Sequence, residues 1–309
     1  MFVVLILVAG CSGIRTGEPK RSVDYRTGSD GLVLDIVSDF NRIYEFDQNV
    51  DVVVEVRNKG AFPQAGETIE AYIWAGGFDT DILELRTETG NGALDTTSLE
   101  GKSPVNLDGG YTAAVFEADV HDLPSGTPSY KTPIIIDATY KYKTIASPII
   151  CVDPNPSITE IKERVCEVGQ YGSVSLKGSQ GAPVAVTRVE EDVTSNYILF
   201  RIYVDNVGGG RVIPKDGSHG PQWNPNKGYD WDELNKVYIN RVTVGNTDVD
   251  SCSPDVGSNI DVEKGRGYIL CRFQATGDGV YKSPLNIELE YGYQSSIRQD
   301  IEVIKEVQI

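Results

Sequence analysis

Residues 51–60 read DVVVEVRNKG, and residues 199–208 read LFRIYVDNVG. Every second residue in them is apolar, namely Val52, Val54 and Val56 in one and Phe200, Ile202 and Val204 in the other. Alternation with period two is typical of a strand with one face in a core and the other in solvent. Asn-x-Gly ends each segment and tolerates the positive φ angles of a tight turn. The sequence therefore predicts a half-buried strand followed by a turn, present twice.

A second pair of similar segments follows these strands. Residues 130–152 read YKTPIIIDATYKYKTIASPIICV, and residues 281–303 read YKSPLNIELEYGYQSSIRQDIEV. Four positions match, pairing Ile136 with Ile287, Tyr140 with Tyr291, Tyr142 with Tyr293 and Val152 with Val303. The two pairs of segments are offset by 151 and 148 residues and keep the same order. One structural unit therefore occurs twice in the chain.

Further short segments have strand character, and turn residues such as Asn91-Gly92 and Asp278-Gly279 separate them. They are Leu32–Val37, Thr68–Ala75, Ala113–Ala118, Ile134–Tyr142, Ile198–Val204, Tyr238–Val244, Gly267–Gln274 and Leu285–Tyr293. Many short strands with turns between them indicate an all-β fold. We expect two tandem immunoglobulin-like β-sandwich domains, over residues 31–150 and 151–309. The one helix we expect is short, over residues 230–236 (DWDELNK), with Asp230 as its N-cap.

The N-terminal residues resemble an export signal. Residues 2–9 (FVVLILVA) are apolar but shorter than the ~20 residues that span a bilayer. The run continues into Val8-Ala9-Gly10-Cys11, which resembles the lipobox of lipoprotein signal peptides, although no Lys or Arg precedes it. That resemblance implies a signal over residues 1–11, a lipid on Cys11 and a polar tether over residues 12–30. The alternatives are a truncated membrane anchor and a buried first strand.

Four cysteines remain after Cys11, and an even number in an exported chain indicates disulfides. We expect the local pairs Cys151–Cys166 and Cys252–Cys271, because each closes a modest loop in the second half. The alternative is a Cys₄ zinc site, which usually brings its ligands in C-x₂-C pairs that this chain lacks.

The formal net charge of −17 comes from 45 acidic and 28 basic residues. A nucleic-acid partner is not expected, because phosphate contacts need a basic surface. The acidity serves solubility or, alternatively, divalent-cation binding at carboxylate-rich loops.

Catalytic motifs are missing from the sequence. The two histidines, His121 and His219, are far apart, and no phosphate loop, G-x-S-x-G elbow or H-E-x-x-H occurs. Carboxylate groups such as 190–192 (EED) and Asp79 with Asp81 are interpreted as solvated faces. We therefore expect neither an enzyme nor a bound metal or cofactor.

Residues 217–231 (GSHGPQWNPNKGYDW) have no counterpart in the first half of the chain. Their aromatic residues Trp223, Tyr229 and Trp231 form a possible platform for a sugar or a protein partner. The alternative is that they cap one end of the sandwich as part of its core. Asp230 and Asp232 offer oxygen ligands for calcium, but their spacing matches no defined calcium loop.

The segment Val52–Gly60, followed by Glu67–Trp74 (ETIEAYIW), resembles the prokaryotic cell-adhesion-related domain known as CARDB, and Ile202–Gly208 resembles the same element. The overall layout is similar to that of archaeal surface proteins. The resemblance implies an extracellular sandwich that serves as a spacer, scaffold or adhesive module, with no fixed catalytic residues.

These observations together predict a non-catalytic lipoprotein, exported and anchored at the extracellular face of the cell envelope. Its expected partners are the membrane, through the lipid on Cys11, and an envelope protein or glycan. The alternatives are a carbohydrate-binding surface module that uses residues 217–231, and an accessory subunit of an extracellular enzyme or an unrecognised hydrolase.

Overall fold

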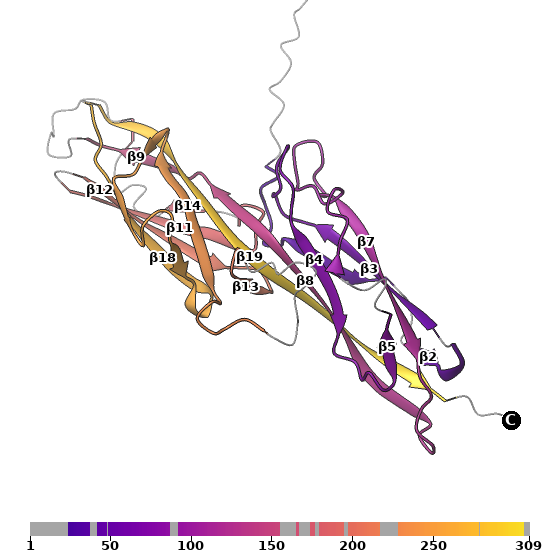
Figure 1. Cartoon of the computed structure of the whole chain (residues 1–309). Coiled ribbons are helices and arrows are strands. Elements are labelled where there is room, and N and C mark those ends of the chain that lie inside the picture. The colour runs from indigo at the N-terminus through magenta and orange to yellow at the C-terminus, as the bar shows by residue number, and fades with distance from the viewer. Residues whose placement is uncertain are drawn as a thin grey trace, which may run out of the picture.

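The computed structural model of this chain describes residues 24–37, 42–47, 49–86, 92–154, 165–166, 174–176, 179–194, 197–216, 228–277 and 279–305. The described residues form an all-β fold, as predicted, with short 3₁₀ helices only at η1 (Glu45–Asp47) and η2 (Glu263–Gly265). No helix in these ranges has the length and hydropathy of a membrane span. Three sheets build the molecule (Figure 1).

Each half of the chain contributes one sheet of its own. The first-half sheet has the order β1 (Leu32–Ile36), β3 (Asn49–Asn58), β7 (Tyr111–Val120) and β5 (Leu83–Leu85). The second-half sheet has the order β10 (Val174–Ser175), β11 (Val184–Val193), β12 (Ile198–Asn206), β18 (Arg266–Phe273) and β16 (Ser251–Ser253). The repeated strands occupy equivalent places in these sheets. Strand β3 lies between β1 and β7, and β12 lies between β11 and β18.

The third sheet is common to both halves and is called here the shared sheet. Its order is β15 (Thr247–Asp248), β14 (Lys236–Val244), β19 (Tyr281–Ile304), β8 (Ser129–Ala146), β4 (Ala71–Gly76) and β6 (Gly92–Ala93). Four short strands extend it: β2 (Arg42–Tyr44), β9 (Ile149–Val152) and β13 (Arg211–Ile213) pair with β19, and β17 (Asn259–Asp261) pairs with β14. Both other sheets belong to sandwiches that this sheet completes.

Strands β8 and β19 form a long antiparallel ribbon that runs through the whole molecule (Figure 1). They pair from Ala146 opposite Ile287 to Ser129 opposite Ile304. These strands are the two copies of the sequence repeat, so the copies pair with each other. Tyr140 lies opposite Tyr293 and Tyr142 opposite Tyr291. The matched residues are therefore exchanged by an approximate two-fold axis through the middle of the ribbon, which we call the waist.

The four tyrosines at the waist are buried side by side on one face of the ribbon. Neighbouring ring centroids lie 5.7 to 6.3 Å apart. The Tyr140 hydroxyl accepts a hydrogen bond from the Leu32 amide at 3.1 Å, and the Tyr291 hydroxyl accepts one from the Val184 amide at 3.3 Å. These amides belong to β1 and β11, so the hydroxyls attach each half's own sheet to the ribbon.

The other two tyrosines bind the repeated asparagines. The Tyr142 hydroxyl donates to Asn58 Oδ1 at 3.2 Å, and the Tyr293 hydroxyl donates to Asn206 Oδ1 at 2.9 Å. The fully buried Asn58 also donates through Nδ2 to the carbonyls of Phe62 and Leu99. The Asn-x-Gly turns are therefore fixed to the ribbon by the same contact in both halves. Burial holds the pKa of all four tyrosines above the usual value.

Two independent tandem immunoglobulin-like domains are not confirmed. The main hydrophobic core is one continuous cluster that contains Val54 and Phe116 from the first half and Phe200 and Ile269 from the second, and a small second cluster surrounds the Cys151–Cys166 disulfide. The halves share a sheet, and one core cluster contains residues from both sides of the expected boundary near residue 150.

The strand predictions held at every segment named from the sequence, but one long strand, β11, was missed. A bulge between Val186 and Arg188 interrupts its pairing with β12 and shifts the alternation by one residue. The expected helix over residues 230–236 is wrong. Glu233 bonds back to Asp230 in a single turn, and Asn235 then donates to the Val212 carbonyl and joins the sheet.

Candidate functional site

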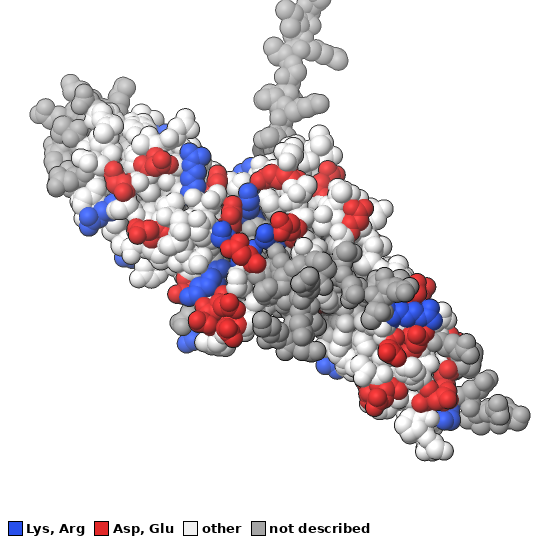
Figure 2. Space-filling model, in the orientation of Figure 1, with Lys and Arg blue, Asp and Glu red and all other residues white. Residues whose placement is uncertain are grey.

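A pocket of about 410 Å³ opens at the waist. Its apolar wall consists of Phe62, Tyr142 and Tyr291. Its rim is charged, and the rim residues are Glu67, Glu70, Lys141, Lys143, Lys215, Asp216 and Glu290. Figure 2 shows Lys and Arg intermingled with Asp and Glu at the middle of the molecule. A pocket of this kind suits a polar ligand that carries groups of both signs.

Ion pairs hold the rim in place. Lys143 Nζ lies 3.0 Å from Glu67 Oε1 and 3.5 Å from Glu290 Oε1, and Lys141 Nζ lies 2.7 Å from Glu70 Oε2. The two glutamates raise the pKa of Lys143, although partial burial acts in the opposite direction as the largest single influence. These pairs are half-exposed, so each adds little stability and serves mainly to fix the rim geometry.

Lys215 differs from the other two rim lysines. Its ammonium lies 4.0 Å from the centroid of the Tyr238 ring, and no ion pair of this residue occurs in the described part of the chain. The ring attracts the ammonium through a cation–π contact. Of the three rim lysines, Lys215 is therefore the one whose charge no carboxylate pairs with among the described residues.

The predicted aromatic segment begins at the rim of this pocket. Asp216 lines the pocket immediately before residue 217, and the described chain resumes at residue 228. Trp231 has 88% of its surface exposed, so the interpretation as buried core is wrong for this residue. Tyr229 is half-buried, and burial raises its pKa to about 12. Trp223 and His219 lie outside the described residues.

The first described residues also lie at the waist. Tyr25 lines a second pocket of about 550 Å³ together with the loops 63–67 and 100–105. The Thr27 carbonyl accepts a hydrogen bond from Lys102 Nζ at 3.3 Å, and the Gly28 carbonyl accepts one from Ser179 Oγ. Cys11 lies outside the described residues. The chain that precedes Asp24 therefore joins the body at its middle and not at an end.

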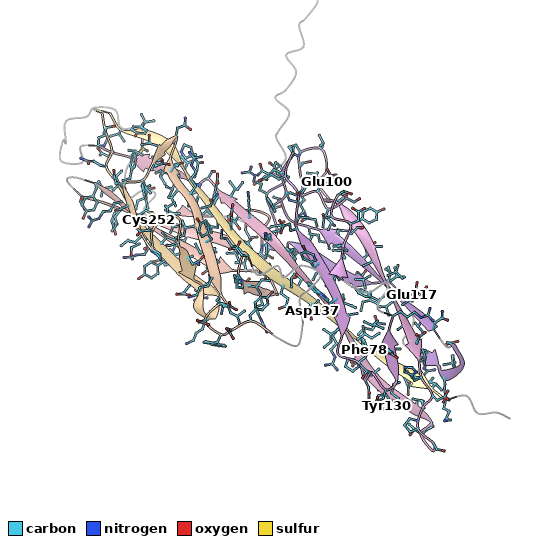
Figure 3. The ribbon with its side chains drawn as sticks, viewed as in Figure 1. Phe78, Glu100, Glu117, Tyr130, Asp137 and Cys252 are labelled. Atoms are coloured by element: carbon cyan, nitrogen blue, oxygen red, sulfur yellow. A yellow bond between two sulfur atoms is a disulfide. The ribbon has the colours of Figure 1, made fainter. Side chains whose placement is uncertain are left out.

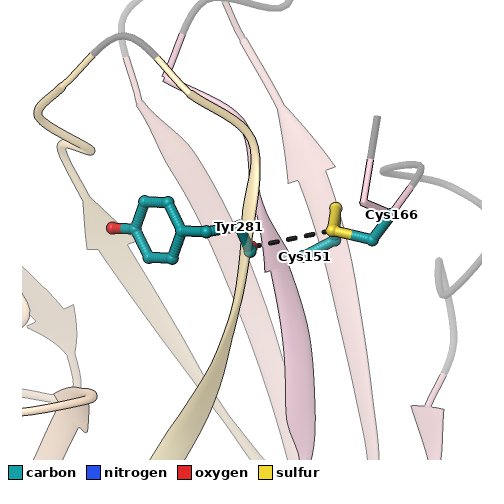
Figure 4. The surroundings of a disulfide bond; sticks show 3 residues. All are labelled: Cys151, Cys166 and Tyr281. Carbon is teal, nitrogen blue, oxygen red and sulfur yellow. Dashed lines mark hydrogen bonds between the residues drawn. A yellow bond between two sulfur atoms is a disulfide. The ribbon is translucent and has the colours of Figure 1, made fainter. Parts of the chain in front are cut away.

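Both predicted disulfides are present: Cys151–Cys166 and Cys252–Cys271, with sequence separations of 15 and 19. The first joins Cys166 to Cys151 in β9, which pairs with the start of β19. Cys166 Sγ lies 3.6 Å from the Tyr281 carbonyl oxygen there (Figure 4). The second joins the edge strand β16 to β18 (the label Cys252 in Figure 3). Disulfides of this kind indicate an oxidising compartment.

Glu191 is a buried carboxyl in β11 with 5% of its surface exposed. Neither of its oxygens has a hydrogen-bond partner among the described residues. Burial raises its pKa to about 7. The backbone amide of Cys151 lowers the pKa by less, and its geometry falls short of a hydrogen bond. The sequence reading placed residues 190–192 on a solvated face, which is correct for Glu190 and Asp192 but wrong for Glu191.

Two other residues named in the sequence analysis, His121 and Asp79, form pairs at the surface. His121 Nε2 lies 3.1 Å from Glu84 Oε2, and both side chains are exposed to solvent. Asp79 accepts a hydrogen bond from the Tyr130 hydroxyl at 2.7 Å, which lowers its pKa. No group of three or more His, Cys, Asp or Glu residues is placed to hold a metal ion within the described ranges.

Sequence reasoning missed the charged rim of the waist pocket. The sequence feature that could have revealed the rim is a difference between the two copies of the repeat. Lys141 and Lys143 stand where the second copy has Gly292 and Gln294. The lysines thus break the symmetry that the four tyrosines keep. No protein-family model matches this chain, and no curated protein matches it.

Proposed function

We propose that this protein is a non-catalytic lipoprotein of the extracellular cell surface, exported and held by a lipid on Cys11, which acts as a spacer, scaffold or adhesion module. The observation that carries the proposal is the β8–β19 ribbon, which joins two sandwiches into one elongated body. Its 24-residue strand extends about 80 Å at ~3.3 Å per residue. The resemblance to cell-adhesion-related domains and the two disulfides support the same role.

A lipid on Cys11 holds such a body by its waist, because Asp24 joins it there. Both ends of the elongated body then remain free to meet partners. Two acyl chains give stable attachment, whereas one gives only weak attachment.

Intact-mass spectrometry of the protein purified from its native membranes tests the anchor. We expect a chain that begins at Cys11 and carries the mass of a diacylglyceryl group. A Cys11→Ser variant is the control, and we expect it to lose the added mass and to leave the membrane fraction. A native chain without acyl mass would contradict the proposed anchoring.

A second candidate function is glycan binding through the predicted aromatic segment, which follows the pocket residue Asp216, and the 88% exposure of Trp231 favours it. An exposed indole offers an apolar face for a sugar ring, and Lys215 offers a cation for an acidic substituent. We expect Trp231→Ala to abolish binding on a glycan array, whereas Tyr281→Ala, at the far end of the ribbon, leaves binding unchanged. Equal binding by both variants would rule out Trp231 as part of a glycan site.

A further inference from the structure

The outward face of the second-half sheet carries tyrosine and arginine side chains at high density. We call it the Tyr–Arg face, and it consists of Arg188, Tyr197, Leu199, Arg201, Tyr203, Arg266, Tyr268, Leu270 and Arg272. These residues occupy the alternate positions of β11, β12 and β18 that point away from the core, with Tyr197 directly before β12. They therefore form one surface on neighbouring strands.

Contacts within the Tyr–Arg face hold it rigid. Tyr203 lies directly opposite Tyr268, with ring centroids 6.3 Å apart. The Arg188 guanidinium lies 4.0 Å from the centroid of the Tyr203 ring, and that of Arg272 lies 4.6 Å from the centroid of the Tyr197 ring. Tyr268 is nevertheless 56% exposed. Tyrosine and arginine are enriched in protein interfaces and dominate their binding energy, and a pre-ordered surface loses little entropy on binding.

The charge of this face is opposite to that of the whole chain. Its four arginines exceed by one the three carboxylates among them, which are Glu190, Asp192 and Asp205. Glu190 pairs with Arg188 at 3.1 Å and with Arg201 at 3.3 Å, so the basic groups without an ion pair in the described part of the chain are Arg266 and Arg272. The chain as a whole has a net charge of −17. A basic patch on an acidic protein selects an acidic partner surface.

The equivalent face of the first half is acidic. The outward positions of its sheet carry Asp35, Asp51, Glu55, Glu84, Glu117 and Asp119, against the basic Arg57 and Arg86. Glu117 is labelled on this half in Figure 3. Two large apolar side chains are exposed beside the carboxylates: Tyr111 is 58% exposed and Val115 is 43% exposed. This surface is called the acidic face.

We propose that the Tyr–Arg face of one copy of this chain binds the acidic face of a second copy. The two faces belong to equivalent sheets of a duplicated unit, so they match in strand direction and twist, and their charges are complementary. The Tyr–Arg face spans three strands of eight to ten residues and covers roughly 430 Å². The contact then buries about 900 Å² in total, which is the size of weak, transient interfaces. The inference goes beyond the proposed function, because it concerns the folded body and does not require the lipid.

Sedimentation velocity of the full-length chain, in detergent where it is acylated, tests the association. We expect the sedimentation coefficient to rise with protein concentration at 50 mM salt and to rise less at 500 mM, because charge pairing at this interface is screened. Dimers and longer assemblies both support the proposal. A chain that stays monomeric up to several hundred micromolar at low salt would overturn it.

Charge reversal identifies the faces. Arg266→Glu with Arg272→Glu reverses the Tyr–Arg face, and Asp35→Arg with Asp51→Arg and Glu117→Arg reverses the acidic face. Each multiple variant alone carries two faces of like charge, and we expect at least tenfold weaker self-association. The control pair, Arg241→Glu with Arg298→Glu, lies on the shared sheet, and we expect it to associate like the unchanged protein. A control that weakens association equally would show a mere effect of net charge and overturn the proposal.

Mixing the two face variants gives the decisive result. In the mixture each reversed face meets a surface of opposite charge on the other variant, so we expect association to return to within a few-fold of the unchanged protein. Recovery also shows that both variants are folded. Two variants that have unchanged thermal unfolding and still fail to associate on mixing would refute this pairing of faces.

Discussion

At Gly60 the backbone leaves no room for a side chain. A methyl group there would overlap the Tyr142 hydroxyl and would lie 2.6 Å from the Gly181 carbonyl oxygen. Gly209, in contrast, has no atom within 4 Å of such a group. We expect Gly60→Ala to lower the free energy of unfolding by about 2 kcal/mol or more. Gly209→Ala should change it by no more than about 0.5 kcal/mol.

Urea denaturation of both glycine variants measures the difference. Adding Tyr142→Phe removes the overlapping oxygen, so the double variant should recover part of the stability that Gly60→Ala loses. Equal midpoints for the two glycine variants would mean that the contact between turn and ribbon is loose.

The buried Glu191 predicts a pH dependence of stability. Its pKa is about 7 in the folded protein, against an ordinary value of 4.5. Between these pH values the unfolded chain releases the proton and the folded chain keeps it, so stability falls as pH rises and levels off above pH 7. We expect Glu191→Gln to match the unchanged protein at pH 4 and to exceed it by up to about 3 kcal/mol at pH 8.

Urea denaturation at pH 4, 6 and 8 checks this expectation, with the exposed neighbour Asp192→Asn as the control. The control should keep the pH dependence of the unchanged protein. If the advantage of Glu191→Gln were the same at every pH, the carboxyl would have the same pKa in the folded and unfolded states.

At the scale of strands, the sequence predicts most elements because their alternation is regular. The period-two pattern of β3 and β12 follows directly from Val52–Val56 and Phe200–Val204. Strand β11 was not predicted because its bulge shifts the alternation by one residue. An unbroken alternation would place Arg188 and Glu190 inward, whereas the bulge places Val189 and Glu191 there. The same shift explains why Glu191 was read as solvated. Alternation identifies a face only while the register is continuous.

The waist pocket illustrates a second limit at this scale. Its residues come from β8, β19 and two loops that are distant in sequence. In the sequence, Lys141 and Lys143 look like ordinary outward residues of a strand. Only the pairing of β8 with β19 brings Lys143 within 3.5 Å of Glu290, and no local pattern encodes that pairing. The disulfides were easier to predict, because two short loops limit the plausible pairs.

At the scale of the molecule, the duplication was visible in the sequence but the arrangement of the copies was not. Two copies of a half-buried strand predict two buried faces. They do not reveal that the segments 130–152 and 281–303 pair with each other, because alternation fixes the face of a strand and not its neighbour. The shared ribbon changes the expected thermodynamics, since neither sandwich is complete without a strand that the other half also uses.

The fused core predicts that both halves unfold together. Tyr140 and Tyr291 each sit beside tyrosines of the other copy, and β8 has no replacement for β19 as its neighbour. Opening one sandwich therefore exposes apolar surface of the other. We expect one calorimetric transition with equal calorimetric and van't Hoff enthalpies, whereas independent tandem domains would give two transitions or a ratio well above one.

Hydrogen exchange locates the coupling. In a cooperative body the slowest amides of β3 and β12 open with the same free energy, which is that of global unfolding. Gly60→Ala, although it lies in the first half, should then reduce protection in β12 as much as in β3. Protection that falls in β3 alone would mean that the ribbon joins two bodies of independent stability, because the cost of the overlap at Tyr142 would have stayed within one sandwich.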